Sequence, residues 1–211
     1  VRERHADGLI LMTGAMPVEL DDAALPPMVV ALEYLPTRRL PTIRIDNEGA
    51  AAQATAHLLD LGHRAIALLN GPADLSVSEQ RMVGWHAALN RHGLAASSDL
   101  LLAGPATEDR GYRATRALLA AAQPPTAIVC ASMFLASGCC RAIRDGNLRV
   151  GADISVIAHD DGLTTVRPEA FEPPLTTTFA SIRAAGVRVA EMAAALVGGA
   201  EAADLAEVWP V

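Results

Sequence analysis

The chain has 211 residues, a formal net charge of −7 and 17 basic residues, all of them arginine. Without lysine it can form neither a Schiff base nor the lysine contact of a P-loop to phosphate. Its acidic balance argues against nucleic-acid binding through its own surface, because such binding needs a basic footprint.

Short apolar runs alternate with helical patterns along the whole chain. The predicted strands cover residues 8–12, 28–32, 42–46, 65–69, 100–103, 127–131, 154–158 and 205–211. The predicted helices cover residues 48–61, 76–92, 110–122, 133–145 and 181–197, the second of them opening on a capping box formed by Ser76 and Glu79. Single helices between strands indicate βαβ units, and hence an α/β fold of parallel sheets covered on both faces.

The sequence carries no pattern of a membrane span, a secretion signal or a metal site. The uncharged stretch 117–140 has a proline pair near its middle, which would break a lipid-exposed helix. Residues 1–5 lack the apolar core of a signal peptide, and this abrupt start suggests a fragment. The three cysteines are odd in number and lack C-x-x-C spacing, so they support neither a disulfide framework nor a zinc site. We therefore expect a cytoplasmic chain without a cofactor or a metal.

Polar residues follow many of the predicted strands. In open parallel sheets ligands bind beyond the carboxyl ends of the strands, so these residues form the candidate site. They are Thr13, Gly14, Glu33, Tyr34, the stretch from Asn70 to Ser78, Ser132, His159, Asp160, Asp161 and, in the first turns of the following helix, Arg81.

Two of these side chains suit a sugar. Arg81 offers five donors in a rigid fork and Asp160 offers paired acceptors, which fits vicinal hydroxyls or a carboxylate beside a hydroxyl. The alternative for Arg81 is an ion pair within the chain or a solvated helix position. His159 and Asp160 could suggest a metal or an acid–base pair, but neighbours at a strand end point in different directions, and no other cluster has ligand spacing.

No motif of an enzyme is complete. Ser132 follows a strand and opens a helix, but it lacks the flanking glycines of a nucleophile elbow. No G-x-G-x-x-G follows any strand, so the dinucleotide fingerprint is absent. His63, between a helix stop and a strand, is interpreted as a structural turn histidine.

Eleven segments together carry a resemblance, although each is weak alone. They are Asp7–Leu11, Asp46–Ala50, His57–Ala67, Gly71-Pro72, Ser78–Gly84, Ala88-Leu89, Gly93, Pro125–Ile128, Asp153–Ile157, Asp160-Asp161 and Pro174–Thr177. In this order they resemble the effector-binding core of the LacI/GalR family of bacterial transcription regulators, over nearly the whole chain.

The resemblance implies a fold like that of periplasmic sugar-binding proteins, with two doubly wound parallel-sheet subdomains. By position, residues 1–46 and 178–204 would form an incomplete N-terminal subdomain. Residues 47–177 would form the C-terminal subdomain, to which residues 205–211 would cross back.

The resemblance also assigns roles to the candidate residues. The family's effector lies in the cleft between the subdomains. There the arginine of a Ser-x-x-Arg-x-x-Gly motif and the first aspartate of an Asp-Asp pair hold the ligand. In this chain these are Arg81, in the motif that opens with Ser78, and Asp160.

Three further candidate residues match the family pattern less directly. Ser132 stands where the family usually has asparagine, and it can still bond a hydroxyl. His159 stands where many members have an aromatic residue, and a histidine titrating near neutral pH would make effector binding pH-sensitive. Glu33 stands where some sugar-binding members place a carboxylate.

The implied function is the ligand-sensing core of a LacI-type repressor that binds a sugar or sugar derivative and forms a homodimer. It would contact operator DNA only through a helix-turn-helix domain, which this chain lacks. It would not contact a membrane. The effector would act through its differential affinity for two arrangements of the subdomains. The alternative is a periplasmic sugar-binding protein of a transporter. An enzyme on the same architecture comes third, because no nucleophile–base pair supports it.

Overall fold

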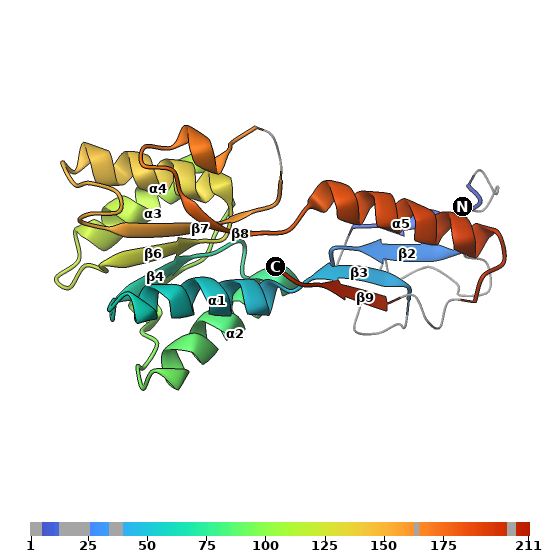
Figure 1. The fold of residues 1–211 in the computed structure, drawn as a ribbon, viewed down its shortest axis with the longest axis horizontal. Coiled ribbons are helices and arrows are strands. Elements are labelled where there is room, and N and C mark those ends of the chain that lie inside the picture. The colour runs from blue at the N-terminus through green and yellow to red at the C-terminus, as the bar shows by residue number, and fades with distance from the viewer. Residues whose placement is uncertain (1–5, 13–25, 34–39, 163–164, 202–205) are drawn as a thin grey trace. The chain divides into compact units, whose positions relative to one another are not determined.

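The computed structural model describes residues 6–12, 26–33, 40–162, 165–201 and 206–211. The chain folds as two compact units (Figure 1), the first made of Val1–Asp46 with Ser181–Pro210 and the second of Asn47–Ala180 with Val211. Each unit contains a parallel β-sheet, so the predicted α/β fold is confirmed. Within the described ranges, no helix is long and apolar enough to cross a membrane.

The first unit is one parallel sheet with a helix packed on it. In sheet order its strands are β1 (Leu9–Leu11), β2 (Met28–Ala31), β3 (Thr42–Ile45) and β9 (Ala206–Trp209). Helix α5 (Ile182–Val197) is capped by Ser181, whose hydroxyl accepts a hydrogen bond from the Ala184 N–H at 3.1 Å. The helix side chains that pack on the sheet recur at three- and four-residue spacing and are Ala185, Val189, Met192 and Leu196.

The last strand corrects the predicted subdomain boundaries. Residues 205–211 are predicted to cross back to the C-terminal subdomain, yet β9 pairs with β3 along its whole length. Arg188 of α5 stabilises β9 in this position by donating two hydrogen bonds to Glu207 Oε1, at 2.8 and 2.7 Å. Trp209 Nε1 donates to the other oxygen of the same carboxylate at 3.1 Å. Residues 178–180, predicted for the first unit, belong to the second, because β8 extends through Phe179.

The second unit is a five-stranded parallel sheet with two helices on each face (Figure 1). In sheet order its strands are β5 (Leu101–Leu102), β4 (Ile66–Leu69), β6 (Ala127–Cys130), β7 (Ser155–Asp160) and β8 (Thr176–Phe179). Its α-helices are α1 (Asn47–Asp60), α2 (Ser76–Arg91), α3 (Glu108–Leu119) and α4 (Met133–Asp145). Short 3-10 helices lie at Ser98–Leu100 and Pro168–Ala170.

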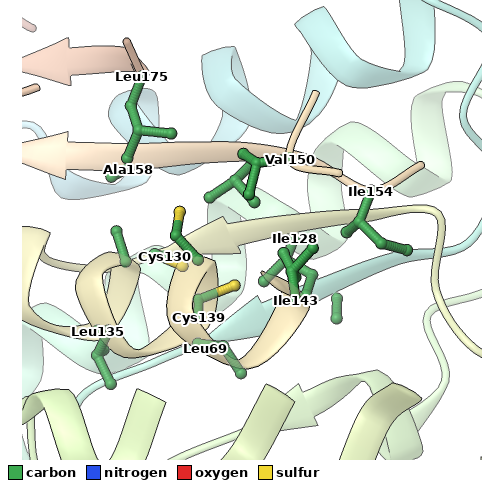
Figure 2. Packing of buried hydrophobic residues seen from close by; sticks show 14 of the residues in the cluster. Leu69, Ile128, Cys130, Leu135, Cys139, Ile143, Val150, Ile154, Ala158 and Leu175 are labelled. Carbon is green, nitrogen blue, oxygen red and sulfur yellow. The ribbon is translucent and has the colours of Figure 1, made fainter. Parts of the chain in front are cut away.

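Each face of this sheet has its own core. On one face α1 and α2 bury Trp85, whose Nε1 donates to the Ile66 carbonyl at 3.3 Å. On the other face α3 and α4 cover a cluster that includes Cys130 and Cys139 (Figure 2). All three cysteines are free and buried, and burial raises the pKa of Cys140 to about 12. Buried, protonated thiols of this kind act as small packing groups and are not nucleophiles.

Two glycines allow close packing between the paired helices, one on each face of the five-stranded sheet. A methyl group on Gly84 of α2 would collide with the Glu48 carbonyl oxygen of α1. A methyl group on Gly138 of α4 would collide with the Glu108 carbonyl oxygen of α3. Because both obstacles are backbone atoms, neither position can gain a side chain unless the helices move apart. Gly84 thereby fixes the position of α2, the helix that carries Arg81.

Three local predictions are wrong. The N-cap position of α2 is Leu75, which makes no side-chain cap bond, so Ser76 does not stand at the N-cap position that the predicted capping box requires. Strand β7 runs two residues beyond its predicted end, because it stays paired with β8 as far as Asp160. Strand β8 itself lies in a stretch for which no strand is predicted.

Candidate functional site

The candidate residues of the second unit lie at the carboxyl ends of β4, β6 and β7. Asn70 begins the turn from β4 to α2, and Arg81 lies one turn into that helix. Ser132 joins β6 to α4, and His159 and Asp160 end β7. Because these three strands are parallel, the residues lie along one edge of the sheet.

A small cavity of about 10 Å³ opens at this edge. Arg81 of α2, His159 of β7 and Thr178 of β8 are the polar residues that line it, and alanines of α1 are among the apolar ones. This volume accommodates about one water molecule or one hydroxyl group. Asp160 and Ser132 do not line it. A ligand that contacts all of these residues must therefore extend from the cavity over the strand ends.

His159 is held in one orientation and carries no charge. Its Nδ1 lies 3.0 Å from Thr178 Oγ1, and the residue is buried. Burial, and after it the positive charge of Arg81, lowers the pKa of His159 to about 4. The ring is therefore neutral between about pH 5.5 and 8, where an unperturbed histidine would titrate. The prediction that His159 titrates near neutral pH is therefore wrong.

Asp160 keeps an acceptor for a ligand. Its Oδ1 accepts a hydrogen bond from the Gly162 N–H at 2.9 Å, and its backbone carbonyl accepts one from the Ala180 N–H at 3.0 Å. The residue is partly exposed, and Oδ2 has no hydrogen-bond partner among the residues that the structure describes. These contacts hold the carboxylate in place and leave one oxygen available for a hydroxyl.

Ser132 is the N-cap of α4. Its hydroxyl oxygen accepts a hydrogen bond from the Leu135 N–H at 3.3 Å. The O–H of a serine can donate while its oxygen accepts, so the proton of Ser132 remains available to a ligand. The residue is half-buried at the strand edge.

Asn70 shapes the turn that leads to Arg81. Its amide donates to the Ser78 carbonyl at 2.8 Å, and its Oδ1 accepts from the Gly71 N–H at 3.0 Å. The Ser78 hydroxyl is buried against Gly71, where a methyl group would come within 2.7 Å of Ser78 Oγ. Ser78 therefore packs inside the turn.

The remaining candidates lie elsewhere. Glu33 belongs to the first unit, where it follows Leu32, a residue with a φ of 65° just after β2. It is partly exposed, and its role stays a prediction. Thr13, Gly14 and Tyr34 lie outside the described residues.

His63 lies at the opposite, amino end of the same sheet. Its Nδ1 is 2.9 Å from Thr126 Oγ1 and its Nε2 is 2.9 Å from Ser155 Oγ. Thr126 precedes β6 and Ser155 begins β7, so the ring links the starts of three neighbouring strands. Burial lowers the pKa of His63. This geometry agrees with the predicted structural role.

Thr178 and Phe179 are missing from the predicted site. The run Thr176–Phe179 is rich in β-branched residues, which is typical of a strand and could have revealed β8. The two prolines just before it favoured a loop. Once β8 is in the sheet, its carboxyl end lies beside that of β7.

The family model of the periplasmic binding protein-like domain matches residues 55–210. The chain belongs to this family. It is 44% identical over 162 residues to the HTH-type transcriptional regulator AglR of Rhizobium meliloti, covering 77% of this chain and 45% of AglR. It is 34% identical over 177 residues to the HTH-type transcriptional repressor CytR of Escherichia coli, covering 82% of this chain and 51% of CytR. The chain thus spans about half the length of these relatives.

Solved structures agree with the family. A complex of the transcriptional regulator CelR with cellobiose matches with a TM-score of 0.88 at 29% identity, covering 99% of this chain and 64% of that one. A LacI-family regulatory protein from Chloroflexus aggregans matches with a TM-score of 0.86 at 26% identity, covering 99% of this chain and 75% of that one. The predicted resemblance to the LacI-type core is confirmed, and the named relatives are regulators rather than enzymes.

Proposed function

We propose that this periplasmic-binding-protein-like chain is the ligand-sensing core of a LacI-type transcriptional repressor, with a sugar or sugar derivative as its effector. The observation that carries the proposal is the small cavity walled by Arg81 and His159, with Asp160 in the next position of the same strand. The names of AglR and CytR, and the cellobiose bound to CelR, support the same class of protein and ligand.

The chemistry of this edge suits neutral hydroxyl groups. Arg81 supplies charge-assisted donors, and Asp160 supplies an acceptor at the same end of the sheet, on the face of β7 opposite His159. His159, being neutral, adds one ring nitrogen without adding charge. One ligand hydroxyl fills the cavity, and its neighbours on the ring reach the carboxylate outside it.

Other candidates have supporting roles in this proposal. Ser132 donates a hydrogen bond from its O–H to a hydroxyl of the effector. Ser78 contributes through the turn that positions Arg81, since its own hydroxyl is buried against Gly71. Glu33 is a further acceptor for a sugar hydroxyl.

The effector then acts as an allosteric ligand. It shifts the chain between two conformations only to the extent that it binds one of them more tightly. In the whole protein, a cytoplasmic homodimer, a separate helix-turn-helix domain would bind operator DNA. The acidic core itself would make no DNA contact, because its net charge is −7.

A thermal-shift screen of the chain against neutral sugars and sugar acids tests this function. We expect at least one neutral sugar to raise the melting temperature, because a ligand that binds only the folded state stabilises it by mass action. Arg81→Ala should weaken binding of that sugar about 10- to 100-fold, since it removes charge-assisted hydrogen bonds.

Arg91→Ala is the matched control, because Arg91 is an exposed arginine at the far end of the same helix. It should leave the affinity unchanged. If no sugar stabilises the chain, or if both arginine variants bind the sugar as wild type does, the proposed effector site is wrong.

A further inference from the structure

Phe179 is an exposed phenylalanine at the carboxyl edge of the sheet. It is the last residue of β8, and 52% of its surface is accessible. Phenylalanine is usually buried, and this chain has only three. Its ring therefore leaves a substantial apolar surface beside the polar residues of the candidate site.

The strand register places this ring beside Asp160. β7 and β8 are parallel, with His159 opposite Thr178 and Asp160 opposite Phe179. The contact of 3.0 Å between His159 Nδ1 and Thr178 Oγ1 shows that opposite residues in this pair project to the same face. Since successive side chains alternate, Asp160 and Phe179 both project to the other face, on strands about 4.8 Å apart.

The pairing extends to the very end of both strands. The Ala180 N–H donates to the Asp160 carbonyl at 3.0 Å, directly after Phe179. Gly162 N–H holds the Asp160 carboxylate at 2.9 Å. Phe179 and Asp160 are therefore neighbours across the strand pair, and both residues are accessible.

A carboxylate beside an aromatic face matches the two surfaces of a cyclic sugar. A pyranose carries hydroxyls around its rim and C–H groups over its face. Asp160 can accept from the rim hydroxyls while a ring packs against the face. We infer that Phe179 is the platform on which the effector's sugar ring stacks, and that it selects cyclic sugars over open-chain polyols. This inference rests on the proposed function and adds to it a residue and a substrate class.

Binding measurements with cellobiose, methyl β-D-glucopyranoside and sorbitol test the inference on the full chain. Phe179→Leu keeps apolar bulk but loses the aromatic face, and should weaken pyranoside binding about 3- to 10-fold. Phe179→Trp should bind within about twofold of wild type, because it restores a stacking face. Binding of sorbitol should be weak and unaffected by either change.

Saturation-transfer NMR gives a second measurement, which would not change if Phe179 had only a structural role. In the wild-type chain the C–H protons on one face of the pyranoside should receive the strongest transfer, and Phe179→Leu should remove this preference. Phe134→Leu is the matched control, since Phe134 is also exposed (39%) but lies on α4, outside the strand pair.

The outcomes separate the two proposals. If pyranosides bind, Arg81→Ala loses them and Phe179→Leu binds as tightly as wild type, only the stacking role is overturned. An equal loss in Phe134→Leu, or equal affinity for sorbitol and pyranosides, also overturns it. If no sugar binds the wild-type chain, both proposals fall together.

Discussion

His63 lies at the amino end of the five-stranded sheet and His159 at its carboxyl end, and the two side chains make different contacts. At the amino end, His63 contacts the hydroxyls of Thr126 and Ser155 with its two ring nitrogens. At the carboxyl end, His159 contacts Thr178 through Nδ1, while Nε2 has no hydrogen-bond partner in the part of the chain that the structure describes. His159 also lines the small cavity at the carboxyl end of the sheet, whereas His63 does not.

This difference separates the structural role of His63 from the ligand contact that we propose for His159. An unpartnered ring nitrogen can still bond to a water molecule or a ligand where there is space for one. The cavity beside His159 provides that space. A histidine whose nitrogens are both bonded within the fold has nothing left to offer a ligand.

The largest expected effect comes from the glycine contacts that position the carboxyl end. Gly84→Ala and Gly138→Ala each force a methyl group against helix backbone, and each should destabilise the chain by about 3 kcal/mol. Urea unfolding measures this loss. Gly84→Ala should weaken sugar binding more than Gly138→Ala, because Gly84 lies on the helix of Arg81, whereas Gly138 lies on the helix that Ser132 caps. Equal affinity losses in the two variants would show that α2 does not position the site separately.

The pH dependence of stability should distinguish His159 from an ordinary histidine. Its folded pKa of about 4 lies below the unfolded value of about 6.5, so the unfolded chain binds more protons between these values. The stabilisation is therefore complete above pH 6.5 and is lost as the pH falls through 4. Between pH 7 and 4.5 the loss should be roughly 2–3 kcal/mol.

His159→Asn keeps a polar group near Thr178 but cannot titrate, so it should flatten that part of the pH profile. Urea unfolding of both chains at several pH values measures the difference. An unchanged acid slope in the variant would mean that His159 is not the residue that the unfolded chain protonates.

At the amino end, His63→Ala removes contacts to two hydroxyls at once. We expect a loss of about 1–2 kcal/mol in the free energy of unfolding, since a single hydrogen bond contributes about 0.5–1.5 kcal/mol. Sugar affinity, measured by titration calorimetry, should not change. A large loss of affinity with little loss of stability would reverse the assigned roles of the two histidines.

The sequence predicts most of this architecture because its signals are local. Helix α4 and strand β6 have apolar runs and stop signals that need no tertiary information. The end of β7 and the whole of β8 are different, because their pairing continues past the point where the hydrophobic pattern stops. The sequence identifies Arg81 and Asp160 as candidates, but Phe179 needs the strand register to become one. The pKa of His159 depends on burial and on Arg81, which no local pattern reveals.

The smallest expected effect separates capping from ligand contact. Ser132 caps α4 and Ser181 caps α5, each by accepting one backbone N–H. Replacing either by alanine should cost about 1 kcal/mol of stability. Ser132→Ala should in addition weaken sugar binding by about threefold or more, because it removes a donor at the strand edge. If calorimetry finds the same affinity in both variants, Ser132 serves only to cap α4, and its proposed contact with the ligand is wrong.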